Sequence, residues 1–151
     1  MAMVKEKNML KKIILSITLF LLPLLALAQN TEEIEWINKL DTKAIATFGD
    51  AKRLFYSTFP DLSKQQSNTI KLLNQYKDDA PLKRGMIAAI IARELNLKGS
   101  LFYMLTGLER YACRACIAEG IMSANSSEND LISGPELLDI MIQAKIAKEG
   151  N

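Results

Sequence analysis

The residues with the clearest chemical potential are two cysteines, Cys113 and Cys116, in a Cys-Arg-Ala-Cys motif. Two thiols at this spacing can form a reversible disulfide, and an accessible thiol of low pKa would make the chain a small thiol-active protein. The thiol pKa is lowered when a cysteine lies in the first turn of a helix. The apolar pattern instead places the motif two turns inside a helix that starts near Thr106. We therefore expect both thiols to be buried in the core, with a Cys113–Cys116 disulfide and a redox function as the alternative.

Other catalytic chemistry has few residues available to it. The sequence contains no histidine, which excludes Ser-His triads, histidine-ligated metals and c-type haem. A zinc site would need two further ligands besides the cysteines. The carboxylates that stand out, Glu109 and Glu136, have the spacing of helix caps rather than of a catalytic pair. We therefore expect a protein that is not an enzyme and that holds no metal and no cofactor.

The first 28 residues have the pattern of a secretory signal peptide. Four lysines precede an apolar run from Ile13 to Ala28 that closes on Ala-Leu-Ala, and cleavage is expected between Ala28 and Gln29. The run contains Pro23 and is shorter than the roughly 20 residues of a membrane-spanning helix. We therefore expect an exported protein, periplasmic or at the cell surface, with no stable membrane span after cleavage.

The charge balance argues against nucleic acid as a partner. The chain has 19 basic and 17 acidic residues, of which residues 1–28 hold four and one, so the net charge of the remainder is about −1. A nucleic-acid binder neutralises phosphates with an excess of Lys and Arg. We therefore expect no nucleic-acid partner, and the remaining length fits one domain with a core of its own.

Apolar residues recur at helical spacing through the rest of the chain. An N-terminal helix is predicted over residues 29–45, where Asn30 and Glu33 have the spacing of a capping box. Residues 46–149 are predicted to form a helical domain, because strand-like alternation bounded by turns is missing from them. The sequence therefore predicts an all-α fold, a compact bundle of about six helices.

The helices of this domain are expected to begin at cap residues or at apolar runs. The run after Met86 is nearly all apolar, which indicates a central, mostly buried helix. Gly120 is expected to end the helix that opens at Thr106. The expected starts are Thr47, Ser63, Lys83, Thr106 and Ser133.

Two further apolar segments are expected to contribute to the core. One comprises residues 101–105, Leu-Phe-Tyr-Met-Leu, which would act as a binding patch only if it were exposed. The other is the last helix, in which apolar residues between Leu137 and Ala144, Ile142 among them, form a wide face.

Three segments of the domain resemble one another, and they begin at Ala46, Leu82 and Ile132. Each has an apolar residue, a cap-like position, Gly or Pro at the third step, and then apolar residues at helical spacing. The offsets between them are 36 and 50 residues. A period in this range is typical of a repeat made of a helix, a loop and a capped helix.

Residues 112–145 carry the pattern most fully. They read Ala-Cys-x-x-Cys-x-x-x-Gly-Ile, then a polar loop at 123–130, then Ile-Ser-x-x-Glu opening an apolar helix. This pattern resembles the S-layer homology repeat, in which the last string usually reads I-T-R-A-E. Residues 82–121 are similar to the end of one such repeat joined to the start of the next.

The resemblance implies a pseudo-threefold helical module that anchors proteins to cell-wall polysaccharide. It also implies that Arg84, Ser133 and Glu136 lie near the binding grooves. The arginine of the family string is kept only at Arg84, because Phe48 and Gly134 stand at that position in the other two segments.

These observations lead to one hypothesis of function and one alternative. The leader, the helical domain and the absence of a catalytic set favour an exported, non-enzymatic module of the bacterial cell envelope. Its partner would be an envelope protein or a cell-wall polysaccharide. The alternative is a small exported thiol-active protein that uses Cys113 and Cys116.

Overall fold

The structure is a computed structural model, and it describes residues 31–60, 68–97, 101–125 and 127–150. The predicted leader, its cleavage site between Ala28 and Gln29, and the caps predicted at Asn30 and Ser63 lie outside the described residues. The chain divides into two units, residues 1–39 and 40–151. Residues 31–41 are helical, within the predicted range 29–45.

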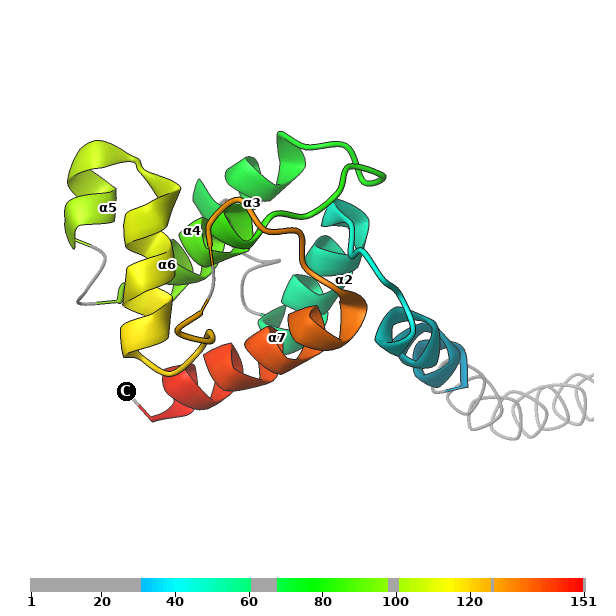
Figure 1. The fold of residues 1–151 in the computed structure, drawn as a ribbon. Helices are drawn as coiled ribbons and strands as arrows, with labels where there is room; N and C mark the ends of the chain where they lie inside the picture. Colours follow the sequence, from blue (N-terminus) through cyan, green and yellow to red (C-terminus); the bar gives the residue numbers. More distant parts are fainter. Residues whose placement is uncertain (1–30, 61–67, 98–100, 126, 151) are drawn as a thin grey trace, which may run out of the picture. The chain divides into compact units, whose positions relative to one another are not determined.

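The second unit is an all-α domain, as the sequence predicts (Figure 1). In its described part the only extended pairings are two isolated bridges, Thr47 with Pro81 and Lys83 with Leu131. Its helices are α2 (Phe48–Thr58), α3 (Asn68–Asn74), α4 (Arg84–Glu94), α5 (Leu101–Thr106), α6 (Glu109–Ala118) and α7 (Gly134–Glu149).

Helices α2, α4 and α7 begin at the same position of the three similar segments. Their N-cap residues are Thr47, Lys83 and Ser133, each the second residue of its segment. Thr47 forms a full capping box with Asp50, and the hydroxyl of Ser133 accepts a hydrogen bond from the third residue of α7. Lys83 makes no such bond. The two capped starts confirm the predictions at Thr47 and Ser133.

The first residues of the three segments are hydrogen bonded to one another in a closed ring. The N–H of Ala46 donates to the carbonyl of Ile132 (2.7 Å), that of Ile132 to Leu82 (3.1 Å), and that of Leu82 to Ala46 (2.9 Å). All three side chains are fully buried. Each residue therefore donates to one equivalent residue and accepts from the other, which is the cyclic relation that a threefold repeat requires.

A second set of hydrogen bonds repeats around this ring. The first N–H groups of α2, α4 and α7 donate to the carbonyl oxygens of Ala80 (3.0 Å), Asp130 (2.9 Å) and Lys43 (2.8 Å), respectively. These acceptors lie just before the next segment of the ring. N–H groups at the start of a helix have no partner within that helix, so each helix start here is satisfied by the neighbouring segment.

The core is built around α4, which packs most extensively against α6. Seven of its eleven residues are buried, which confirms the predicted central helix. Small side chains on the facing side of α6 allow the two helices to approach closely. The buried residues of α6 are Ala112, Cys113, Ala115 and Cys116.

The capping box predicted at Thr106 is wrong. Thr106 is the last residue of α5, and its hydroxyl donates to the carbonyl of Phe102 (2.6 Å). The reason is Gly107, whose φ of +68° ends α5 in the left-handed region, so α6 starts later, at Glu109. Gly120, at φ +72°, ends α6 as predicted.

Two of the segments predicted as core are partly exposed. Within residues 101–105 only Tyr103 is buried, because α5 packs mainly against α6 and a single-sided contact covers one flank of a helix. On α7, Ile142 is 56% exposed, because it lies on the flank away from the buried Leu137 and Met141. Helical spacing shows which residues share a face, but neighbours decide whether that face is covered.

Replacing Gly134 with alanine tests how far the domain depends on the contact between α7 and the chain at Leu40. A Cβ at Gly134 would overlap the carbonyl oxygen of Leu40. We expect Gly134→Ala to lower the free energy of unfolding by more than about 2 kcal/mol, measured by urea unfolding. The control is Gly150→Ala, because a Cβ there meets only the carbonyl of Ile146 at 3.5 Å. Equal stability of the two variants would contradict the prediction.

Candidate functional site

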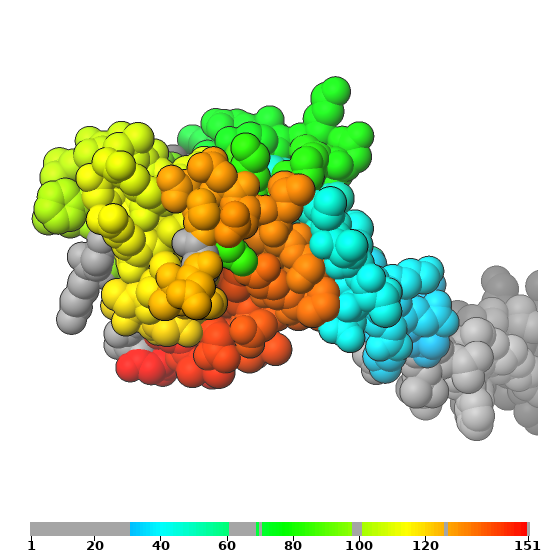
Figure 2. All heavy atoms as spheres, viewed as in Figure 1, coloured from blue at the N-terminus to red at the C-terminus, as the bar shows by residue number. Residues whose placement is uncertain are grey.

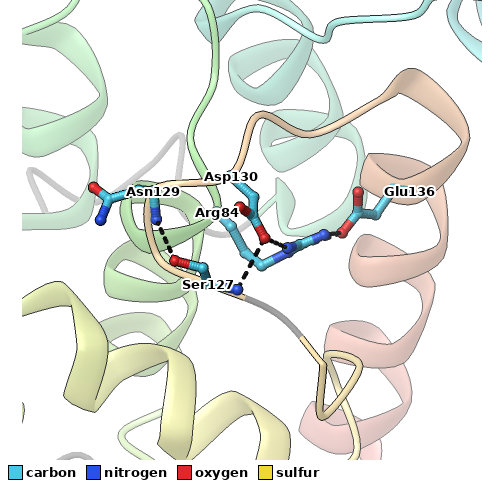
Figure 3. Close-up of polar contacts among 5 residues, drawn as sticks. All are labelled: Arg84, Ser127, Asn129, Asp130 and Glu136. Carbon is cyan, nitrogen blue, oxygen red and sulfur yellow. Dashed lines mark hydrogen bonds and ion pairs between the residues drawn. The ribbon is translucent and has the colours of Figure 1, made fainter.

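The three residues singled out by the family resemblance come together where α4 and α7 begin. Figure 3 shows two of them, Arg84 and Glu136. The Arg84 Nε donates to Glu136 Oε1 at 2.9 Å, and its Nη2 donates to the same oxygen. The backbone N–H of Glu136 in turn donates to the Ser133 hydroxyl at 3.3 Å. A fourth residue completes this junction cluster, because Arg84 Nη1 donates to Asp130 Oδ2 at 2.7 Å.

The backbone ring is what places the cluster. The chain around Leu82 pairs in an antiparallel sense with the chain around Ile132. In such a pairing, the residue two places after Leu82 lies opposite the residue two places before Ile132. Those residues are Arg84 and Asp130, which are also joined through the backbone N–H of Arg84. Glu136 lies on the first turn of α7, where a carboxylate is favoured by the helix dipole.

The loop before Ile132 is held by its own polar groups. Asp130 Oδ2 accepts the N–H of Ser127 at 2.9 Å, and the Ser127 hydroxyl accepts the N–H of Asn129 at 3.4 Å. The carbonyl of Glu128 accepts the N–H of Gly85 in the first turn of α4. The side chains of Ser127 and Asn129 remain exposed, and Figure 3 shows the Asn129 amide turned away from Arg84.

Burial divides the cluster into a fixed inner part and an accessible outer part. The Arg84 side chain is 12% exposed, whereas Asp130 is 49% and Glu136 is 32% exposed. One guanidinium faces two carboxylates, so the cluster carries one net negative charge. Arg84 therefore acts mainly as a cross-link between α4 and α7, while Asp130, Ser127 and Asn129 present hydrogen-bonding groups to solvent.

The equivalent position in the other two segments has no ion pair of this kind. Phe48 is buried and stacks on Tyr76, with ring centroids 4.3 Å apart and planes at 15°. Gly134 lies too close to the Leu40 carbonyl to carry any side chain. Of these three equivalent positions in the described part of the chain, Arg84 alone gives a charged surface cluster.

Asp50 occupies in the first segment the place that Glu136 occupies in the third. Its carboxylate accepts hydrogen bonds from Lys43 Nζ (2.5 Å) and from the N–H and hydroxyl of Thr47 (2.8 and 2.9 Å). Burial by itself would raise the pKa of Asp50, but these hydrogen bonds and the Lys43 charge outweigh it and leave the pKa below 3.8. Asp50 is therefore held ionised as part of the helix cap.

Cys113 and Cys116 are both free thiols and both buried. Cys116 Sγ donates to the carbonyl of Ala88 at 3.7 Å. Burial raises the pKa of Cys113 to about 11 and that of Cys116 to about 12. A reactive cysteine is exposed and has a lowered pKa, so the environment of this pair agrees with the predicted core role and gives no support to thiol chemistry.

A small pocket lies among α3, α4, α5 and the start of α6. It has a volume of about 170 Å³, below the range of roughly 300–1,000 Å³ that is usual for sites holding drug-sized ligands. Arg93 and Tyr103 both line the pocket, and the Arg93 guanidinium lies 5.3 Å from the centroid of the Tyr103 ring. The pocket is lined by Leu72, Tyr76, Met86, Ala89, Ile90, Arg93, Tyr103, Gly107 and Glu109.

Within the residues that the structure describes, no group of three or more Cys, Asp or Glu side chains is placed to hold a metal ion. In the same residues, no helix has both the length and the apolar character needed to cross a membrane.

The sequence alone did not single out Asp130, Ser127 or Asn129 as site residues. They lie in the polar loop at 123–130, where nothing distinguishes one polar residue from another. The signal that could have found Asp130 is the register of the repeat, because antiparallel pairing at Lys83 and Leu131 sets it opposite Arg84.

Comparisons of the chain with models of protein families, with curated proteins and with solved structures found no match.

Alkylation of the two thiols tests their burial. Because the pKa values of Cys113 and Cys116 are about 11 and 12, almost no thiolate is present at pH 8 in the folded protein. We expect labelling by iodoacetamide to be at least about 100-fold slower in the native protein than in urea. Mass spectrometry counts the labels over time. Rapid native labelling of either cysteine would contradict the burial and revive the thiol-active alternative.

The pH dependence of stability tests the cap at Asp50. Its folded pKa lies below the ordinary value of 3.8, so the stabilisation is complete above that pH and is lost as the pH falls through the folded pKa. We expect Asp50→Asn to cost about 1 kcal/mol at pH 7 and to flatten the fall in stability below pH 4. Urea unfolding at a series of pH values measures both effects. Asp139→Asn, an exposed site on α7, is the control and should keep the wild-type profile.

Proposed function

We propose that the chain is an exported, non-enzymatic module of the bacterial cell envelope that binds cell-wall polysaccharide at the surface of the junction cluster. The ligand-facing groups would be Asp130 of the cluster and two exposed neighbours in its loop, Ser127 and Asn129. Arg84 would serve from beneath by fixing Asp130 and Glu136 in place.

The observation that carries the proposal is the concentration of exposed polar groups in the loop that faces Arg84. Carboxylate, hydroxyl and amide side chains lie within four residues of one loop, and that loop is anchored to α4 by Arg84 and Gly85. Sugars present closely spaced hydroxyls that both donate and accept hydrogen bonds, so a rigid array of mixed donors and acceptors is complementary to them. A preorganised loop also loses little conformational entropy when a ligand binds.

Two independent sequence features support this proposal. The leader-like pattern of residues 1–28 favours export, and the repeat pattern resembles a family of wall-anchoring modules. The cyclic relation among Ala46, Leu82 and Ile132 is consistent with the pseudo-threefold module that the resemblance implies. An envelope protein is the other partner class, and it is distinguished by the experiment below.

Co-sedimentation with purified sacculi tests polysaccharide binding. We expect wild-type protein to sediment with them, and Asn129→Ala and Asp130→Ala each to weaken binding about fivefold or more, the effect of losing one hydrogen bond of about 1 kcal/mol. The matched controls are Asn125→Ala, an exposed residue of the same loop, and Asp139→Ala on α7.

Thermal unfolding of each variant separates lost binding from lost folding. Absence of sedimentation by the folded wild type would eliminate the polysaccharide. A partner recovered from envelope extracts that is lost with Asn129→Ala but kept with Asn125→Ala would instead identify a protein ligand at the same surface.

A further inference from the structure

Helix α5 carries an apolar surface that the rest of the domain, as far as the structure describes it, leaves exposed. Four of its six residues are large, apolar and between 60% and 75% exposed, and Leu108 just beyond it is 46% exposed. Figure 2 shows the atoms of α5 at the outer edge of the domain, next to those of α6. We call this surface the α5 patch, and it consists of Leu101, Phe102, Met104, Leu105 and Leu108.

The α5 patch belongs to an ordered element rather than to a loose loop. Tyr103 anchors the helix, since it is 4% exposed and lies under the guanidinium of Arg93 on α4. Phe102 contacts the ring of Tyr111 on α6, with centroids 5.7 Å apart. These contacts hold one flank of α5 against the domain and direct the other flank to solvent.

Two arginines border the patch on the side of α6. Arg110 and Arg114 are both exposed and lie one turn apart. Their guanidinium carbons lie 4.9 and 5.9 Å from the centroid of the Tyr111 ring, which itself contacts Phe102. The two cations are therefore held beside the apolar surface. The carboxylate of Glu109 packs over Gly85 at the start of α4, and Glu109 and Glu128 also line a hollow together with Leu108 and Arg110.

We propose that the α5 patch together with Arg110 and Arg114 attaches the domain peripherally to an anionic lipid membrane. Apolar side chains that enter the boundary of the acyl chains, flanked by cations that meet anionic headgroups, are the chemistry of interfacial membrane binding. The inference does not depend on polysaccharide binding, because the junction cluster and the α5 patch share no residue.

The distribution of the apolar residues favours a lipid surface over a protein groove. At 100° per residue, Leu101, Phe102, Met104 and Leu105 spread over about half of the circumference of α5. A helix that docks in a groove presents a narrow stripe over several turns. Helix α5 has fewer than two turns, lies at the outer edge of the domain (Figure 2), and has its exposed apolar side chains spread widely. Apolar side chains spread in this way can all be buried together in the acyl-chain region of a membrane.

The charges argue against a second copy as the occupant. A symmetric dimer would bring the same patch of each copy together, and with it Arg110 and Arg114 of both copies. Like charges in an interface oppose association, whereas anionic headgroups neutralise them.

Vesicle sedimentation tests the proposal, with phosphatidylcholine vesicles that contain phosphatidylglycerol and vesicles that lack it. We expect wild type to bind the anionic vesicles, and Leu101→Ser/Leu105→Ser to reduce binding at least about tenfold. The matched control is Ile142→Ser/Ile146→Ser, which removes two side chains of similar exposure (56% and 57%) from α7 and should bind as wild type does.

A second pair of variants tests the charges. Arg110→Gln/Arg114→Gln should lose the preference for anionic vesicles, since each cation near such a surface strengthens binding by about fivefold. All variants are compared with wild type in the same isolated form, so any contribution of residues 1–28 is common to them. Circular dichroism confirms that each is folded.

Three outcomes would overturn the proposal. One is that folded wild type binds neither kind of vesicle. Another is that the α7 control loses as much binding as the α5 variant. The third is that the wild type is a dimer in light scattering and Leu101→Ser/Leu105→Ser is a monomer, which would assign the α5 patch to self-association.

Discussion

The closed ring of hydrogen bonds among Ala46, Leu82 and Ile132 is the constraint on which the rest of the domain depends. These residues are separated by 36 to 86 positions along the chain, so their pairing closes long loops at a cost in entropy. Their side chains are fully buried, and a buried N–H or carbonyl without a partner would be strongly unfavourable. The three segments must therefore come together as a set. The first N–H groups of α2, α4 and α7 then donate to carbonyl oxygens just before the neighbouring segments.

The same backbone position around this ring has been used in three different ways. Phe48 stacks in the core, Arg84 joins two helices through carboxylates, and Gly134 allows two stretches of backbone to touch. The ring supplies the geometry in each case, and the side chain decides what chemistry that geometry supports. A charged surface arises at Arg84 because the facing loop offers Asp130, and because Glu136 occupies the first turn of α7. The polar cluster therefore depends on the register of the pairing and on two acidic residues that face Arg84, Asp130 in the loop and Glu136 on α7.

Local signals in the sequence were enough to locate most of the architecture. Cap residues at Thr47 and Ser133 and the apolar run of α4 depend on neighbours within a few positions, so they can be recognised without the fold. The exposure of α5 could not be predicted in this way, because apolar composition does not say how many neighbours a short helix will have. The role of Asp130 could not be predicted either, because it depends on an ion pair with Arg84, which lies 46 positions away in the sequence. The error at Thr106 arose because Gly107 turned the chain before the expected helix could begin.

The ring also limits how the pattern can grow. In open-ended solenoids each added unit stacks on the last and leaves a new surface for the next. Here the backbone N–H and carbonyl groups of Ala46, Leu82 and Ile132 are all hydrogen bonded to one another. A fourth segment would therefore have no free group in the ring to pair with. A longer protein assembled from such segments would have to start a separate trio rather than extend this one. Such a protein would grow by three segments at a time, and it would gain new binding surface only with each complete group of three.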